Sequence, residues 1–148
     1  MYRVTRRFEF EAAHRLLGYE GKCKHLHGHS YVAEVTVEGP ELGKLGMLVD
    51  FGALKRLFGA WIDKYWDHNI LLCRSDADMW EKMPELNGGK LPFSTCSNLP
   101  TAEVMARLLF VAGQEMLSLD KRVDLVKVRI QETTDCWAEY YEDKQPTG

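Results

Sequence analysis

The sequence predicts an α+β fold, an antiparallel four-stranded sheet with two helices packed on one of its faces. Polar and apolar residues alternate over residues 2–14, 27–38 and 123–132, which is the pattern of strands buried on one side. Two stretches between the second and third of these strands carry apolar residues at helical spacing. Strands at both ends with helices between them are typical of α+β architecture, and 148 residues suit a single domain spanning 1–148.

The first two strands each carry an apolar face that includes histidine at one end. In the first strand, the even-numbered residues from Tyr2 to His14 form this face, interrupted by Arg6. In the second strand, the odd-numbered residues from His27 to Val37 do so, and the other face is largely polar. A turn that contains Gly and Pro, "EGPELGKLG", follows this pair of strands.

Two helices are expected next, each started by a capping residue. Asp50 can cap the first helix, and Thr101, after Pro100, can cap a second helix of about 18 residues. Glu103 lies in the first turn of the second helix, where a negative charge is favourable. The predicted core-facing residues are Phe51, Leu54, Phe58, Trp61, Ile62 and Tyr65 in the first helix, and Met105, Leu108, Leu109, Ala112, Met116 and Leu119 in the second.

The remaining segments are predicted to be a long loop and two further strands. Residues 73–99 are rich in charge, Gly and Pro, which predicts a loop excursion with little regular structure of its own. In the strand 123–132, one face consists of Val126, Val128, Ile130 and Glu132. A short edge strand is expected after it, before a polar tail.

Composition and charge argue against several classes of function. The 19 basic and 22 acidic residues are interspersed and give a formal net charge of -3, so there is no polybasic tract to bind nucleic acid or an anionic membrane. The N-terminus lacks the apolar core of a secretory signal, and no stretch approaches the roughly 20 apolar residues of a membrane span. We interpret the four irregularly spaced cysteines as reduced thiols, and we expect a cytoplasmic protein without a nucleic-acid or membrane partner.

The segment "CKHLHGHS", residues 23–30, carries the strongest chemical signal. His27 and His29 are two apart on a predicted strand, so their side chains leave one face about 6.6 Å apart, and one metal ion can bridge them at roughly 2.0–2.1 Å per nitrogen. A hairpin of the first two strands brings His14 to the same point. Three imidazole ligands with an open fourth position indicate a catalytic rather than a structural Zn²⁺ site.

Two other interpretations of these histidines stay open from the sequence. They can be unrelated core or surface residues, or Cys23, His25, His27 and His29 can form a structural zinc site. The structural site would crowd its ligands into one short segment and leave His14 unused.

Four further residues are candidates for catalysis or binding. Cys23 precedes the first strand ligand by four residues, where zinc and neighbouring lysines favour a thiolate that can remove a proton; a small apolar filler is the alternative. Asp67 and His68 follow the first helix as "WDHN", and such a pair can shuttle protons near neutral pH. Glu132 points to the buried side at a strand end, where it can bind an N–H and an adjacent amino group or simply be solvated.

Six segments, in order between residues 8 and 133, resemble a known family. They are "FEFEAAHRL", "CKHLHGH", "VDFGALK", "WDH", "PTAE" and "QET". Together they resemble the 6-pyruvoyltetrahydropterin synthase and 6-carboxytetrahydropterin synthase family of the tunnelling, or T-fold, superfamily. The cysteine lies four residues before "HGH", as in the carboxy synthases of queuosine and 7-deazapurine biosynthesis, rather than six before it, at Gly21, as in the pyruvoyl synthases. The segment 73–99 is longer than in compact members of the family.

This resemblance implies the site residues and the assembly. The implied zinc ligands are His14, His27 and His29. The implied catalytic residues are Cys23, Asp67 and His68, and the implied substrate-binding residues are Glu132, which anchors the pterin ring, and Thr101 and Glu103 of "PTAE". It also implies a homo-oligomer, a trimer or a dimer of trimers, whose sheets close into a barrel and whose active sites are shared between neighbouring subunits.

The reaction implied by the resemblance is a zinc-dependent lyase reaction. The substrate would be 7,8-dihydroneopterin triphosphate, and the products 6-carboxytetrahydropterin, acetaldehyde and triphosphate. Alternatives are the pyruvoyl product of the sister branch and, from another class, a non-catalytic, zinc-stabilised pterin-binding module. Arg15, Lys22 and Lys24 lie near the motif and are candidates to bind the triphosphate.

Overall fold

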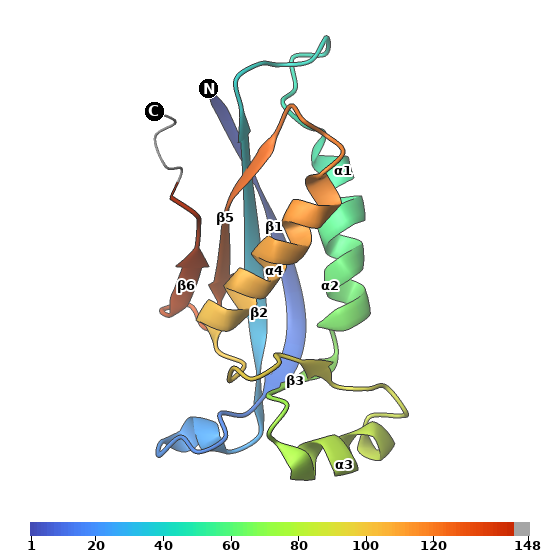
Figure 1. The fold of residues 1–148 in the computed structure, drawn as a ribbon, viewed down its shortest axis with the longest axis vertical. Helices are drawn as coiled ribbons and strands as arrows, with labels where there is room; N and C mark the ends of the chain where they lie inside the picture. Colours follow the sequence, from blue (N-terminus) through green and yellow to red (C-terminus); the bar gives the residue numbers. More distant parts are fainter. Residues whose placement is uncertain (144–148) are drawn as a thin grey trace.

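A six-stranded mixed sheet forms the centre of the computed structural model, which describes residues 1–143 (Figure 1). The strand order is β4-β3-β1-β2-β5-β6. The strands are β1 (Tyr2–His14), β2 (His27–Gly39), β3 (Asn69–Leu72), β4 (Phe93–Ser94), β5 (Asp124–Gln131) and β6 (Trp137–Tyr140). The predicted antiparallel strands are β1, β2, β5 and β6, and the structure adds β3 and β4, which pair parallel to β1 and to each other. The α+β class is therefore confirmed, whereas the four-stranded sheet is wrong.

The long hairpin of β1 and β2 sets the register of the sheet. Phe8 pairs with Ala33 at its centre, and His14 pairs with His27 at its lower end in Figure 1. Even positions of β1 and odd positions of β2 face the same side, as predicted, and their apolar side chains are largely buried in the main core. The alternation therefore places all three histidines on the core face at one end of the hairpin.

Two helices cover that core face (Figure 1). The first is continuous over residues 51–65 and comprises α1 (Phe51–Leu54), a π-helical segment (Lys55–Gly59) and α2 (Ala60–Tyr65). The second is α4 (Ala102–Leu117). Asp50 and Thr101 cap these helices as predicted, by accepting hydrogen bonds from the backbone N–H groups of Gly52 and Val104. None of the helices in residues 1–143 has the length and hydropathy of a membrane span.

The predicted core stripes need three corrections at their ends. Leu54, Phe58 and Ile62 are fully buried, but Phe51 and Tyr65, at the two ends of the helix, are 51% and 36% exposed. Met105 and Leu109 of the predicted stripe in α4 are fully buried, and Leu108 and Met116 are partly buried. The helix ends at Leu117, so the predicted core residue Leu119 is 95% exposed.

The segment 73–99 is not the unstructured loop that its composition predicts. It contains α3 (Ala77–Leu86) and β4, and the buried side chains of Met79 and Met83 form a second, small core with Leu72 of β3. Leu71, the neighbouring residue, belongs to the main core, so α3 packs on the side of β3 opposite to the other two helices. Burial of the two methionines against β3 explains why a segment of weak local signal forms a helix.

A register shift in β5 changes which side chain faces the core. The pairing of β2 with β5 slips between Thr36 and Val37, so Leu125, and not the predicted Val126, packs against the main core. Beyond the shift, Val128 and Ile130 are buried as predicted. The edge strand β6 follows as expected, and the part of the predicted polar tail at 144–148 lies outside the described residues.

Candidate metal centre and active site

The hairpin brings His14, His27 and His29 together at the end of the sheet. His14 is paired with His27 and Ala12 with His29 across the two strands, so the three imidazoles project from one face. One ring nitrogen from each lies within 4.8 Å of the others. Gly28 separates the two β2 histidines on the opposite face, where a Cβ atom would lie 3.0 Å from the backbone oxygen of Ala12.

Hydrogen bonds fix which ring nitrogens are available to a metal. The Nδ1–H of His14 donates to the carbonyl of Pro100 at 2.6 Å, and the Nδ1–H of His27 donates to the carbonyl of His25 at 2.7 Å. Because a carbonyl oxygen only accepts, both Nε2 atoms of the neutral rings carry lone pairs, and these atoms are 3.2 Å apart. Two nitrogens bound at about 2.05 Å to one tetrahedral ion would lie about 3.3 Å apart. A shared cation relieves the repulsion between these lone pairs.

Burial favours the neutral, metal-binding form of the His14 and His29 imidazoles. Desolvation is the main cause that lowers the pKa of His14 to about 4, and it also lowers the pKa of His29. The Nε2 atom of His29 is buried without a hydrogen-bond partner among the described residues, which is costly unless a ligand occupies that position. Neutral, oriented imidazoles with one unsatisfied nitrogen fit a divalent metal ion of the zinc type.

The structure does not support the alternative zinc site. Within residues 1–143, the three histidines are the group of potential ligands that converges, and neither Cys23 nor His25 joins it. His25 is exposed and contributes only its carbonyl, which orients His27.

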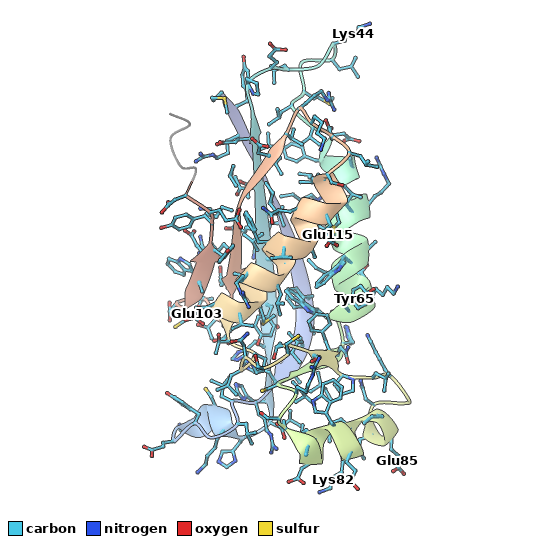
Figure 2. All side chains as sticks on the ribbon, viewed as in Figure 1. Lys44, Tyr65, Lys82, Glu85, Glu103 and Glu115 are labelled. Carbon is cyan, nitrogen blue, oxygen red and sulfur yellow. The ribbon has the colours of Figure 1, made fainter. Side chains whose placement is uncertain are left out.

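A pocket of about 270 Å³ opens beside His14 and collects most of the predicted site residues. Its walls include Cys23 from the loop after β1, Thr101 and Glu103 from the start of α4, and Glu132 from the end of β5. Figure 2 shows Glu103 at this end of α4. The carboxylate Oε1 of Glu132 lies 3.7 Å from Nε2 of His14, so Glu132 does face the buried side. Residues far apart in sequence thus line one cavity next to the histidine cluster.

Asp67 and His68 do not line this pocket. The Asp67 carboxylate lies 3.0 Å from Nδ1 of His68 and accepts a hydrogen bond from the backbone N–H of Glu11. His68 is exposed and lines a separate, open depression with Glu11 and Ser30, whose hydroxyl donates to the Glu11 carboxylate. The predicted pair therefore forms, but it faces a different surface from Cys23 in the same subunit.

The basic residues near the motif differ in their availability. The guanidinium of Arg15 makes two hydrogen bonds to the carboxylate of Asp76, a residue that is only 2% exposed. Because this buried carboxylate needs a cation, Arg15 is committed to the fold, and its suggested role in triphosphate binding is not supported. Lys22 and Lys24 are exposed on either side of Cys23.

Several pocket residues were not found from the sequence. Tyr19, Cys136 and Trp137 contribute to the walls, and the carbonyl of Pro100 orients His14. Cys136 follows the strand-end Glu132 by four residues, and the backbone N–H of Glu132 donates to its carbonyl. No periodic pattern marks these residues, because Tyr19, Pro100 and Cys136 lie in connections between the helices and strands.

Comparisons with known proteins identify the family of this chain. The family model of 6-pyruvoyl tetrahydropterin synthase matches residues 3–143. A protein from Rickettsia typhi named 6-carboxy-5,6,7,8-tetrahydropterin synthase is 37% identical over 139 residues, which cover 94% of this chain and 99% of the relative. A protein of the same name from Haemophilus influenzae is 32% identical over 152 residues, which cover 96% of this chain and all of the relative.

Solved structures share the fold at lower sequence identity. An uncharacterised protein from Wolinella succinogenes has a TM-score of 0.79 at 22% identity, covering 96% of this chain and 98% of that one. The 6-pyruvoyl tetrahydropterin synthase of Caenorhabditis elegans has a TM-score of 0.69 at 24% identity, covering 96% of each chain. At these identities the likeness establishes the fold alone.

Proposed function

The chain belongs to the 6-pyruvoyl tetrahydropterin synthase family, and within it we propose that the chain is a 6-carboxy-5,6,7,8-tetrahydropterin synthase. The proposed reaction converts 7,8-dihydroneopterin triphosphate to 6-carboxytetrahydropterin, acetaldehyde and triphosphate, a step toward queuosine. The observation that carries the proposal is the pocket that holds Cys23 and Glu132 beside the histidine cluster. Relatives that bear this name over nearly their full length, and the position of Cys23 four residues before His27, support this branch.

The proposed metal is Zn²⁺, held by His14, His27 and His29. Three neutral nitrogen ligands with a position left open toward a pocket are the donor set of catalytic zinc. When bound, zinc would supply positive charge that stabilises developing negative charge on a substrate oxygen.

The proposed roles of the chain's own groups follow from their places in the pocket. Cys23, as thiolate, is the proposed base that removes a proton from the substrate side chain, because the loop after β1 places its sulfur at the wall of the pocket beside His14. The two carboxylate oxygens of Glu132 can accept the ring N–H and the neighbouring amino group of a pterin. Thr101 and Glu103 bound the same cavity from the start of α4 and are proposed substrate contacts.

We place Asp67 and His68 in the proposed mechanism as the proton-transfer pair of a neighbouring subunit's site. Their separation from the pocket that holds Cys23 within one subunit supports this arrangement. The terminal strands β4 and β6 have no partner on their outer sides among the described residues, as expected if neighbouring subunits pair there. The proposed assembly is a trimer or a dimer of trimers, and the proposed compartment is the cytoplasm.

Product analysis tests the proposal directly. Zinc-loaded protein is incubated with 7,8-dihydroneopterin triphosphate, and the products are identified by mass spectrometry. We expect 6-carboxytetrahydropterin and acetaldehyde, loss of turnover in Cys23→Ala and His27→Ala, and full turnover in Cys96→Ala, which removes an exposed thiol outside the pocket.

The other outcomes identify the alternatives. A pyruvoyl product would move the chain to the sister branch. Bound metal and bound pterin without turnover that depends on Cys23 would indicate a binding module and refute the catalytic proposal.

A further inference from the structure

The segment that follows α3 is attached to the residues around His68 by side-chain hydrogen bonds. The Nζ of Lys90 donates to the backbone carbonyl of Asp67 at 3.0 Å. The amide Nδ2 of Asn87 donates to Oδ1 of Asn69 at 3.3 Å, and Nδ2 of Asn69 donates to the carbonyl of Leu91 at 3.2 Å. The segment after α3 therefore contacts Asp67 of the proposed proton-transfer pair and Asn69, the residue that follows the pair.

The end of α3 is built to return the chain to this position. Gly88 and Gly89 have φ angles of +61° and +85°, a conformation that glycine adopts without strain. The N–H of Gly89 donates to the carbonyl of Pro84 at 2.7 Å, which ends the helix and reverses the chain. Lys90 is the next residue, and its partly buried side chain points back to Asp67.

The backbone at His68 needs such support. Its φ of +54° lies in the left-handed region, which costs a residue with a Cβ about 1 kcal/mol or more. The N–H of His68 donates to the carbonyl of Glu11 at 2.6 Å, and the Asp67 carboxylate binds both the N–H of Glu11 and the imidazole. These contacts fix the N–H and the imidazole of His68. The carbonyl of Asp67, on the other side of the same peptide, accepts its hydrogen bond from Lys90.

The position also favours a cation. The N–H groups of Trp66 and Asp67 both donate to the carbonyl of Ile62, so this is the C-terminal end of α2, where the helix dipole is negative. A lysine ammonium there gains from the dipole as well as from its hydrogen bond. Its charge makes the bond to the Asp67 carbonyl stronger than one from a neutral donor.

We propose that Lys90 is a positioning residue for the reaction, one that fixes the Asp67–His68 peptide so that the imidazole keeps the orientation needed for proton transfer. The inference rests on the proposed function, because it assumes that Asp67 and His68 move protons. It assigns a role to the segment 73–99, whose composition gave no indication of one.

Replacement of Lys90 by Met tests the inference, because it removes the ammonium and keeps an aliphatic stem. We expect kcat to fall on the order of tenfold, since small misplacement of a catalytic group has effects of this size or larger, with KM within about twofold. Lys90→Arg, which restores a cationic donor, should recover most of the rate. The matched control is Lys82→Met, on the exposed side of α3, where Figure 2 shows Lys82 directed away from the sheet, and it should have no effect.

A double-mutant cycle with His68→Ala separates positioning from general destabilisation. If Lys90 acts through His68, the variant carrying both Lys90→Met and His68→Ala is no slower than His68→Ala alone. Where His68→Ala itself loses turnover, additive losses, or unchanged kcat in Lys90→Met, would overturn the inference.

The NMR signals of the His68 imidazole provide a readout that is independent of turnover. They should move in Lys90→Met and stay in place in Lys82→Met. If His68→Ala leaves turnover intact, the proposed catalytic pair fails. The imidazole signals then decide the positioning role by themselves, and unchanged signals in Lys90→Met would refute it.

Discussion

Metal-free protein is expected to lose stability as the pH falls through the range set by His14. Burial is the main cause that lowers the pKa of this imidazole to about 4 in the folded chain, against 6.5 for the ordinary group. Between these two values the unfolded chain binds the extra proton, so the free energy of unfolding rises with pH. The contribution is fully present above about pH 6.5 and lost as the pH falls to about 4.

The size of the effect follows from the shift. A shift of about 2.5 units at about 1.4 kcal/mol per unit gives about 3 kcal/mol. This is a large share of the roughly 5–15 kcal/mol by which domains are stable. His14 is 2% exposed, so little solvent screening reduces the figure.

Urea unfolding in the presence of a chelator measures this contribution. The free energy of unfolding is determined between about pH 7 and pH 4.5 for wild type, His14→Asn and His25→Asn, the last replacing an exposed histidine of the same loop. Wild type and His25→Asn should lose about 2.4 kcal/mol more than His14→Asn over this range, because pH 4.5 is still above the folded pKa of about 4. The same pH dependence in all three proteins would refute the reasoning, because the proton would then bind elsewhere.

Three further predictions concern metal and packing. Chelation should lower Tm and added zinc should restore it, because zinc at about 100 times its Kd raises the free energy of unfolding by about 2.7 kcal/mol. No change in Tm would argue against the site. Arg15→Met should lower the free energy of unfolding in urea by about 3 kcal/mol, because it leaves the buried Asp76 carboxylate unpaired. Replacement of the exposed Arg7 by Met should lower it by under about 1 kcal/mol, and equal losses would contradict this prediction. Gly113→Ala should destabilise by about 1–3 kcal/mol, since its Cβ would lie 2.5 Å from Phe58, and unchanged Tm would show that the helices separate easily.

The long strands and the histidine cluster could be predicted from the sequence for one physical reason. Side chains of a strand alternate strictly between two faces, so the parity of His14, His27 and His29 could be assigned without coordinates. The same rule correctly predicted that the Glu132 side chain points to the buried side, where it lies near His14. Capping worked equally well, because a capping hydrogen bond spans only two or three residues.

The errors lie where distant contacts override local preference. The helix α3 contains Pro84 and many charges, and its stability comes from packing Met79 and Met83 on a strand of only four residues. The register shift that exchanges Leu125 for Val126 depends on the pairing with β2, which no local pattern contains. A four-residue parallel strand gives too short a pattern to be recognised beforehand.

The sequence by itself determined the fold class, the face of each long strand and the three histidines that converge, because these follow from short-range periodicity. Only the tertiary structure decided which groups share a cavity. It brought Cys23, Glu132 and the start of α4 together beside His14, turned Asp67 and His68 to another surface, and committed Arg15 to Asp76. The physical reason is that pocket walls and ion pairs join segments whose separation in space is set by strand order and helix packing, which are properties of the whole chain.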